Sequence, residues 1–67
     1  MQGEVTYIQY MKSRPQNSYG FIRGEDKFSY FYLVRQAEDL EVGDKVTFTP
    51  ILHIKGKRAE EIKRCIS

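Results

Sequence analysis

The chain has 67 residues, enough for one small domain with a thin core and too few for a large enzyme pocket. A hydrophobic content of 40% and a charged content of 30% are typical of a folded globular chain and exclude a disordered one. The formal net charge is only +2, but four of the nine acidic residues fall between Glu38 and Asp44, where no Lys or Arg occurs. The rest of the chain is therefore more basic than the total, which suits an anionic partner. We expect residues 1–67 to form a single domain.

Cysteine usage and the start of the chain bear on location. Cys65 is the sole cysteine, so neither an internal disulfide nor a multi-cysteine metal site can form. A reducing compartment, and hence a cytoplasmic location, is the simplest expectation. The first residues lack the basic and apolar regions of a secretion signal, and there is no run of about 18 apolar residues. We expect no membrane contact, no metal and no cofactor.

The first predicted element is a strand. Residues 3–11 are rich in β-branched and aromatic side chains with partial alternation, and Val5 is the best core candidate. Residues 12–17 then combine two cations with Ser, Asn and Pro15, which cannot donate a hydrogen bond to a sheet. This segment predicts a basic loop.

A second strand is predicted at residues 18–23. By the period of two, Tyr19 and Phe21 share one face and Ile22 points the other way. Gly20 lies between the two rings, where it can permit close approach of a ligand or another backbone, or relieve the curvature of the sheet. Curvature is the more frequent reason.

A polar turn at residues 24–27 leads to a third predicted strand at residues 28–34. Every aromatic residue except Phe48 lies between Tyr7 and Tyr32, and a thin core cannot hide so many rings in one half of the chain, so some should face water. Alternation divides the strand into two faces, with Ser29, Phe31 and Leu33 on one and Phe28, Tyr30, Tyr32 and Val34 on the other.

After the third strand, residues 35–40 suit a turn of helix. Residues 45–49 predict a fourth strand with Val46 and Phe48 facing inward. Pro50 should interrupt that strand or mark an edge. With Val5 and Ile22, these inward positions form a core that Ala59 and Ile62 complete.

The last segment is ambiguous. A turn is expected at Gly56, after which residues 58–64 contain good helix formers, and the spacing of Ala59 and Ile62 suits a short helix. Four strands, however, leave two unpaired edges, and a fifth strand through this segment would close the sheet. We favour the strand, which makes the fold all-β.

Catalysis finds little support in the sequence. The sole histidine, His53, follows apolar residues and has no cysteine or serine motif near it. Adjacent carboxylates lie on opposite faces of a strand or in turns, which does not make an acid–base pair. No glycine loop fits a phosphate-binding pattern. We therefore expect that the chain is not an enzyme.

Five motifs follow one another along nearly the whole chain: Gly3-x-Val5, Tyr19-Gly20-Phe21-Ile22, the aromatic third strand, Leu40-x-x-Gly43-Asp44-x-Val46-x-Phe48, and Lys55-Gly56-x-x-Ala59-x-x-Ile62. In this order they resemble the cold-shock domain family. The resemblance implies a small five-stranded antiparallel barrel of the OB type, which binds single-stranded RNA or DNA through aromatic residues on its second and third strands.

The resemblance also implies site residues. Tyr19 and Phe21 match the two rings of the family's second strand, and Tyr7 falls where the family usually carries tryptophan. Lys12 lies in the loop that supplies a lysine, although this loop is longer here, and Lys55 matches a basic residue before the last turn. The candidate nucleic-acid-binding residues are Tyr7, Lys12, Tyr19, Phe21, Phe28, Tyr30, Phe31, Lys55 and Arg58.

The third strand can be aligned with the family in two registers. One puts Lys27 and Ser29 in the core. The other buries Tyr30 and Tyr32, which costs less because a tyrosine can bury its ring while its hydroxyl reaches a partner. Phe31 is a ring of the family's site in both registers, and neither register supplies the family's binding histidine.

The expected function is binding of single-stranded RNA or DNA by stacking on exposed rings, with weak sequence preference and an affinity, low-micromolar or weaker, that falls with salt. An RNA-chaperone role is compatible with this. The alternative is a protein-interaction or self-association module, free or part of a larger polypeptide, that uses the same aromatic face. The sequence leaves open RNA versus DNA, and monomer versus weak dimer.

Overall fold

The computed structural model describes residues 1–37 and 39–65. This part of the chain contains five strands and two short 3₁₀ helices, joined by loops and turns. The strands are β1 (Gln2–Gln9), β2 (Tyr19–Gly24), β3 (Ser29–Leu33), β4 (Lys45–His53) and β5 (Gly56–Arg64), and the helices are η1 (Pro15–Asn17) and η2 (Val34–Gln36). The predicted all-β class is confirmed. The ambiguous last segment is a strand, as we favoured.

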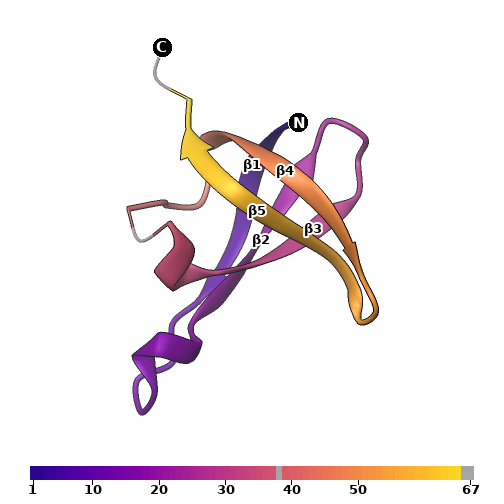
Figure 1. Cartoon of the computed structure of the whole chain (residues 1–67). Helices are drawn as coiled ribbons and strands as arrows, with labels where there is room; N and C mark the ends of the chain where they lie inside the picture. The colour runs from indigo at the N-terminus through magenta and orange to yellow at the C-terminus, as the bar shows by residue number, and fades with distance from the viewer. Residues whose placement is uncertain (38, 66–67) are drawn as a thin grey trace.

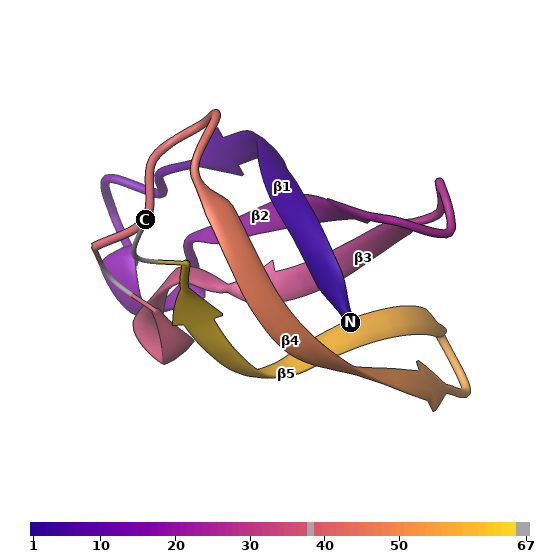
Figure 2. The same ribbon diagram turned by 90° about the horizontal axis from the view of Figure 1, so that it is seen from above.

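The strands close into a barrel in the order β1-β2-β3-β5-β4, and β4 pairs with β1 to complete the ring (Figures 1 and 2). Neighbours are antiparallel except β3 and β5, which run parallel and meet at Phe31 and Arg58. The expected wholly antiparallel barrel is therefore corrected at this one contact. It arises because β4 pairs with both β1 and β5, which leaves β5 beside β3 in the same direction.

The fourth strand continues through Pro50, so Pro50 does not interrupt it and instead marks an edge, the second of the two expectations. Phe48 turns its backbone toward β1, because its N–H donates to Met1 O at 2.8 Å and its carbonyl oxygen accepts from Met1 N at 2.7 Å. By the period of two, the nitrogen of Pro50 faces the same edge, beyond the point where β1 begins. The missing N–H therefore costs no hydrogen bond to β1, and β4 pairs with β5 as far as His53.

One buried cluster forms the core. Of the six core positions predicted from the sequence, only Ile62 is partly exposed, and it packs against the cluster. Tyr30 and Tyr32 join these side chains, as the cheaper of the two registers of the third strand implies. The buried members are Val5, Ile22, Tyr30, Tyr32, Leu40, Val46, Phe48 and Ala59.

The register of β3 follows the second of the two alternatives. Tyr30 and Tyr32 are buried, whereas Phe31 is partly exposed on the other face. Lys27 and Ser29 are exposed, so the alternative that put them in the core is wrong. Burying two rings and exposing the small or charged side chains is the cheaper choice.

Gly20 makes room for a buried ring. It pairs with Tyr32 across β2 and β3. A Cβ at Gly20 would lie 2.6 Å from Cε1 of Tyr32 and 2.6 Å from the carbonyl oxygen of Tyr7. The glycine therefore leaves room both for the buried Tyr32 ring and for the close approach of the β1 backbone.

The connections agree with the sequence in part. The turn of helix expected at residues 35–40 is found slightly earlier, as η2, and position 38 of that prediction lies outside the described residues. The expected turn at Gly56 closes the β4–β5 hairpin. Gly56 has φ +129°, which only glycine adopts readily.

Candidate nucleic-acid interface

Outward-facing residues of neighbouring strands form one line across the barrel. Tyr7 of β1 pairs with Phe21 of β2, and Phe21 pairs with Phe31 of β3. Phe31 is opposite Arg58 of β5, which in turn pairs with Ile51 of β4. We call these five residues the cross-strand row. Residues opposite one another in a sheet share a face, so neighbouring members of the row can contact the same ligand on the outer face.

A β-bulge in β1 turns Tyr7 outward. Val5 pairs with Ile22 and Tyr7 pairs with Phe21, so Thr6 is an extra residue on β1. In a regular strand Tyr7 would share the inner face with Val5. The extra residue reverses that parity and aims the ring of Tyr7 at solvent. The hydroxyl of Thr6 donates a hydrogen bond to the carbonyl oxygen of Phe21 at 3.4 Å, across the bulge.

Four rings lie in mutual contact on this face, and we call Tyr7, Tyr19, Phe21 and Phe31 the ring cluster. The centroids of neighbouring rings are between 5.6 Å and 6.4 Å apart. Tyr19 and Phe31 are nearly parallel at 23°, whereas Phe21 meets Tyr19 at 87° and Phe31 at 73°. These are the spacings of packed aromatic pairs. The cluster is therefore one continuous aromatic surface.

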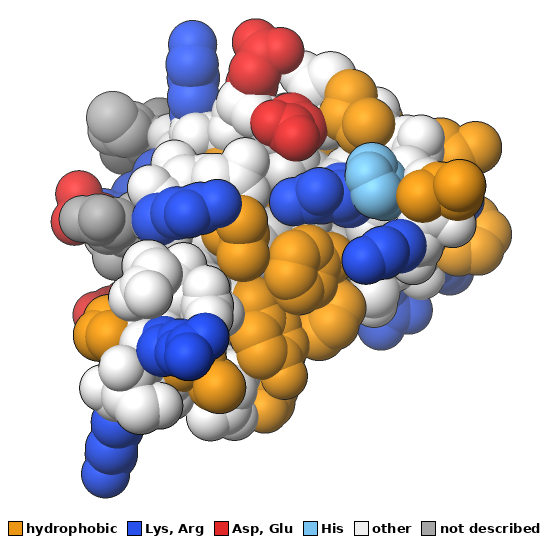
Figure 3. All heavy atoms as spheres, turned by 60° about the horizontal axis from the view of Figure 1, so that its bottom comes forward, with side chains coloured by type: hydrophobic (Ala, Val, Ile, Leu, Met, Phe, Trp, Pro, Cys, Tyr) orange, Lys and Arg blue, Asp and Glu red, His pale blue; other side chains and the backbone are white. Residues whose placement is uncertain are grey.

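The ring cluster is held by the barrel and is also open to solvent. Tyr7 is 45% exposed, and the other three rings are partly exposed. Ile22 and Tyr32 alternate with the cluster along β2 and β3 and anchor these strands in the core. Figure 3 shows hydrophobic side chains gathered at the centre of one face, with Lys and Arg side chains around them.

Cations gather where the cross-strand row meets β5. The guanidinium carbon of Arg58 lies 5.6 Å from the centroid of the Phe31 ring. A hollow of about 490 Å³ adjoins this pair, and none of its lining residues is acidic. A nucleotide whose base stacks on Phe31 could place its phosphate in the hollow, beside the cations. The lining residues are Phe21, Ser29, Phe31, His53, Lys55, Gly56, Lys57 and Arg58.

The prediction that Tyr30 binds nucleic acid is wrong, because its ring lies in the core. Tyr30 is 4% exposed and packs on Phe48 with ring centroids 5.0 Å apart. Its hydroxyl donates a hydrogen bond to Oδ2 of Asp26. This hydrogen bond raises the pKa of Tyr30 and lowers the pKa of Asp26. The hydroxyl thus stabilises the β2–β3 turn.

Phe28 and Lys12 are exposed, and neither of them lines the hollow beside Phe31. Phe28 precedes β3, and Nζ of Lys57 lies 4.5 Å from the centroid of its ring. Lys12 lies in the loop between β1 and β2, far from the β4–β5 hairpin in both views (Figures 1 and 2). The predicted residues that the structure brings together are Tyr7, Tyr19, Phe21, Phe31, Lys55 and Arg58.

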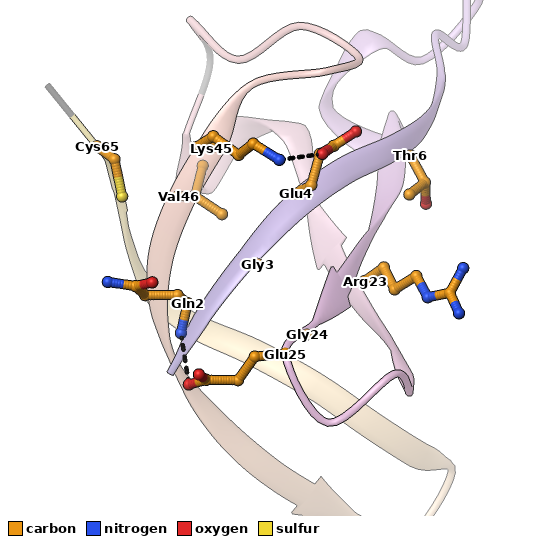
Figure 4. Close-up of a pocket in the computed structure, with 10 residues that line it drawn as sticks. All are labelled: Gln2, Gly3, Glu4, Thr6, Arg23, Gly24, Glu25, Lys45, Val46 and Cys65. Carbon is orange, nitrogen blue, oxygen red and sulfur yellow. Dashed lines mark hydrogen bonds and ion pairs between the residues drawn. The ribbon is translucent and has the colours of Figure 1, made fainter. Parts of the chain in front are cut away.

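A second hollow, of about 670 Å³, carries balanced charges (Figure 4). Glu4 and Lys45 form an ion pair within it, and Glu25 accepts a hydrogen bond from Gln2 N–H at 3.2 Å. The positive charge of Arg23 offsets the negative charge of Glu25. Because the charges cancel, this hollow offers no surplus charge to select a ligand.

The described ranges contain neither a candidate metal site nor a helix that could span a membrane. Within residues 1–37 and 39–65, no group of three His, Cys, Asp or Glu side chains could hold a metal ion. The same ranges contain no helix of the length and apolarity that crossing a bilayer requires. His53 accepts a hydrogen bond from Lys55 N–H through Nδ1 at 3.1 Å, and Cys65 is exposed with a free thiol.

Ile51 and His53 extend the site beyond the residues predicted from the sequence. Ile51 is the β4 member of the cross-strand row, and His53 lines the hollow. The sequence does contain a signal for them. A hairpin with a two-residue turn at Ile54 and Lys55 places Ile51 opposite Arg58, which is one of the predicted binding residues.

Comparisons with known proteins give no relative. No protein-family model matches the chain, and no curated protein or solved structure is significantly similar to it. Function therefore rests on the site itself.

Proposed function

We propose that this protein binds single-stranded nucleic acid on the ring cluster. The observation that carries the proposal is the set of four contacting, solvent-accessible rings, which ends at Arg58 and at a hollow lined by Lys55 and Lys57. Bases stack on aromatic side chains, and cations beside them neutralise phosphates. A folded chain of this size has no need to expose four adjoining rings for its own stability.

The fold supports a place near the cold-shock domains. We infer that the barrel is of the OB type, because its order β1-β2-β3-β5-β4 with one parallel contact agrees with five strands wound as in that fold. The motifs with Tyr19 and Phe21 on the second strand and Gly43 and Asp44 before the fourth support the same inference.

The proposed binding is weakly sequence-specific. Stacking tolerates any base, since every base presents a flat face. Phe21 and Phe31 have no polar atoms with which to read base edges, and the hydroxyl of Tyr7 already donates to Oε1 of Gln9 at 2.8 Å. A role in keeping RNA single-stranded, as RNA chaperones do, is consistent with such binding. The ligand class is therefore single-stranded RNA or DNA, without a preference for either.

Ring removal tests the proposal. The chain has no tryptophan, so its fluorescence comes from tyrosine, and two of the five tyrosines, Tyr7 and Tyr19, belong to the ring cluster. We expect short pyrimidine oligonucleotides to quench this fluorescence, and Phe21→Ala to weaken binding about tenfold, since stacking contributes about 1–3 kcal/mol per base. Tyr19→Ala should act alike when binding is followed by anisotropy of a labelled oligonucleotide.

Tyr10→Ala is the matched control. Tyr10 is an exposed tyrosine beyond the end of β1, and it makes no ring contact with the cluster. Its removal should leave affinity unchanged. Equal affinity of the wild type, Phe21→Ala and Tyr19→Ala would refute the proposal. A dimeric mass by light scattering under reducing conditions, together with no quenching, would support the alternative of self-association through the aromatic face.

A further inference from the structure

The β4–β5 hairpin carries two aliphatic side chains that stacking does not use. Leu52 is 83% exposed and Ile54 is 95% exposed. They lie at the end of a hairpin that extends beyond the barrel (Figures 1 and 2). One exposed aliphatic residue is ordinary, but two at one projecting end form an apolar contact surface. We call Leu52 and Ile54 the hairpin tip.

Only basic charges flank the hairpin tip. The sequence has no Asp or Glu between Lys45 and Ala59, and Lys55, Lys57 and Arg58 follow the tip directly. An apolar end with cationic sides fits a partner that is anionic and also presents an apolar surface. The terminal base pair of a duplex has these two properties, because its flat face is apolar and both its strands carry phosphates.

The hairpin tip is continuous with the proposed single-strand site. Ile51, the last member of the cross-strand row, precedes Leu52 on β4, and by the period of two their side chains point to opposite faces, so the row reaches the tip only by way of the hairpin turn. The hollow beside Phe31 is lined by His53 and Lys55, which enclose Ile54 in the sequence. A single strand on the ring cluster whose phosphate lies in this hollow therefore ends beside the hairpin tip. Whatever adjoins that strand meets Leu52 and Ile54 first.

We propose that the hairpin tip docks against the terminal base pair of a duplex that adjoins the bound single strand. The preferred ligand is then a junction of single strand and duplex. Leu52 and Ile54 cover the apolar face of the terminal pair, as apolar side chains do when they contact base steps. Lys55 and Lys57 neutralise phosphates beside the junction. This inference rests on the proposed function, since it takes the single strand to lie on the cross-strand row.

Three oligonucleotides test the inference. The first is a pyrimidine single strand of about eight nucleotides, within the range of one such site. The second and third join the same strand, by its 5′ or its 3′ end, to a short G·C stem closed by a loop. We expect one of the two junctions to bind about tenfold more tightly than the plain strand, because covering one aliphatic side chain is worth about a decade in affinity.

Leu52→Ser and Ile54→Ser should each reduce this preference and leave affinity for the plain strand unchanged. Val42→Ser is the control, because Val42 is an aliphatic residue that is 62% exposed outside the hairpin. Circular dichroism checks that all variants fold. The inference is supported if the junction preference falls in the two tip variants and persists in the control.

Several results would overturn the inference. Equal binding of the strand and both junctions would refute the tip contact and leave the proposed function intact. Equal loss of plain-strand and junction affinity in Leu52→Ser would make the tip part of the single-strand site instead. Wild-type binding to vesicles that contain phosphatidylserine, lost in Leu52→Ser, would identify the tip as a membrane contact. Absence of any plain-strand binding would refute both proposals.

Discussion

At the scale of single residues, Tyr32 is buried in a way that costs stability. The residue has no exposed surface, and its hydroxyl has no hydrogen-bond partner among the described residues. A buried hydroxyl without a partner costs about 1–3 kcal/mol relative to one that is paired. Tyr30 differs, because its hydroxyl donates to Asp26. The ring of Tyr32 stabilises the barrel, but its oxygen does not.

We predict that Tyr32→Phe raises the free energy of unfolding by about 1 kcal/mol, because the ring stays and the unpaired hydroxyl leaves. Urea unfolding followed by circular dichroism measures it. Tyr30→Phe is the control and should lower the same free energy, since it removes a paired hydroxyl. A loss of stability in both variants would mean that the Tyr32 hydroxyl has a partner after all.

The buried hydroxyl of Tyr32 also makes the stability of the folded chain depend on pH. Burial raises the pKa of Tyr32. The unfolded chain loses this proton near about pH 10, while the folded chain keeps it to a higher pH. The free energy of unfolding therefore keeps its full value below about pH 10 and falls as the pH rises through the pKa of Tyr32 in the folded chain. Tyr32→Phe should lose less stability than the wild type above about pH 10.

At the scale of elements, the bulge in β1 decides which rings reach solvent. Strict alternation from Val5 would bury Tyr7, yet Thr6 as an extra residue turns Tyr7 outward beside Phe21. The bulge lies where β1 leaves its pairing with β4, which ends at Glu4, and continues with β2 alone. The same irregularity thus bends the strand and completes the ring cluster.

This arrangement predicts that Tyr7→Ala separates binding from stability. Affinity for a pyrimidine oligonucleotide should fall about tenfold, since one stacking ring is lost. The free energy of unfolding should change by less than about 1 kcal/mol, because Tyr7 is outside the core. Tyr32→Ala, measured in the same way, should lose about 3 kcal/mol or more. Comparable destabilisation by the two substitutions would place Tyr7 in the core and contradict the bulge.

The elements also show which parts of the site the sequence could predict. Alternation correctly put Ile22 inward and Phe21 outward, because β2 is regular and a two-residue period is a local property. The bulge at Thr6 was not predictable in this way, because it depends on the partner strands. The pairing of Phe31 with Arg58 joins residues distant in sequence, and no local pattern indicates it.

At the scale of the whole molecule, charge pairing matters more than net charge. Glu4 forms an ion pair with Lys45, and Asp44 forms one with Arg64 at 3.1 Å. These pairs place Glu4 and Asp44 at the end of the β4–β5 hairpin that lies away from its turn, whereas residues 46–59 contain no Asp or Glu. A chain of net charge +2 can therefore present a locally basic surface beside its rings.

The salt dependence of binding should report this local charge. If Lys55, Lys57 and Arg58 each neutralise one phosphate, the slope of log affinity against log salt is about −2, since each contact contributes about −0.7 for a single strand. Lys55→Gln should make the slope less negative by about 0.7. Lys63→Gln removes an equal charge from the far end of β5 and should leave the slope unchanged. Identical slopes for these two variants would mean that the phosphates do not pass the hollow beside Phe31, because a general electrostatic attraction does not distinguish the two lysines.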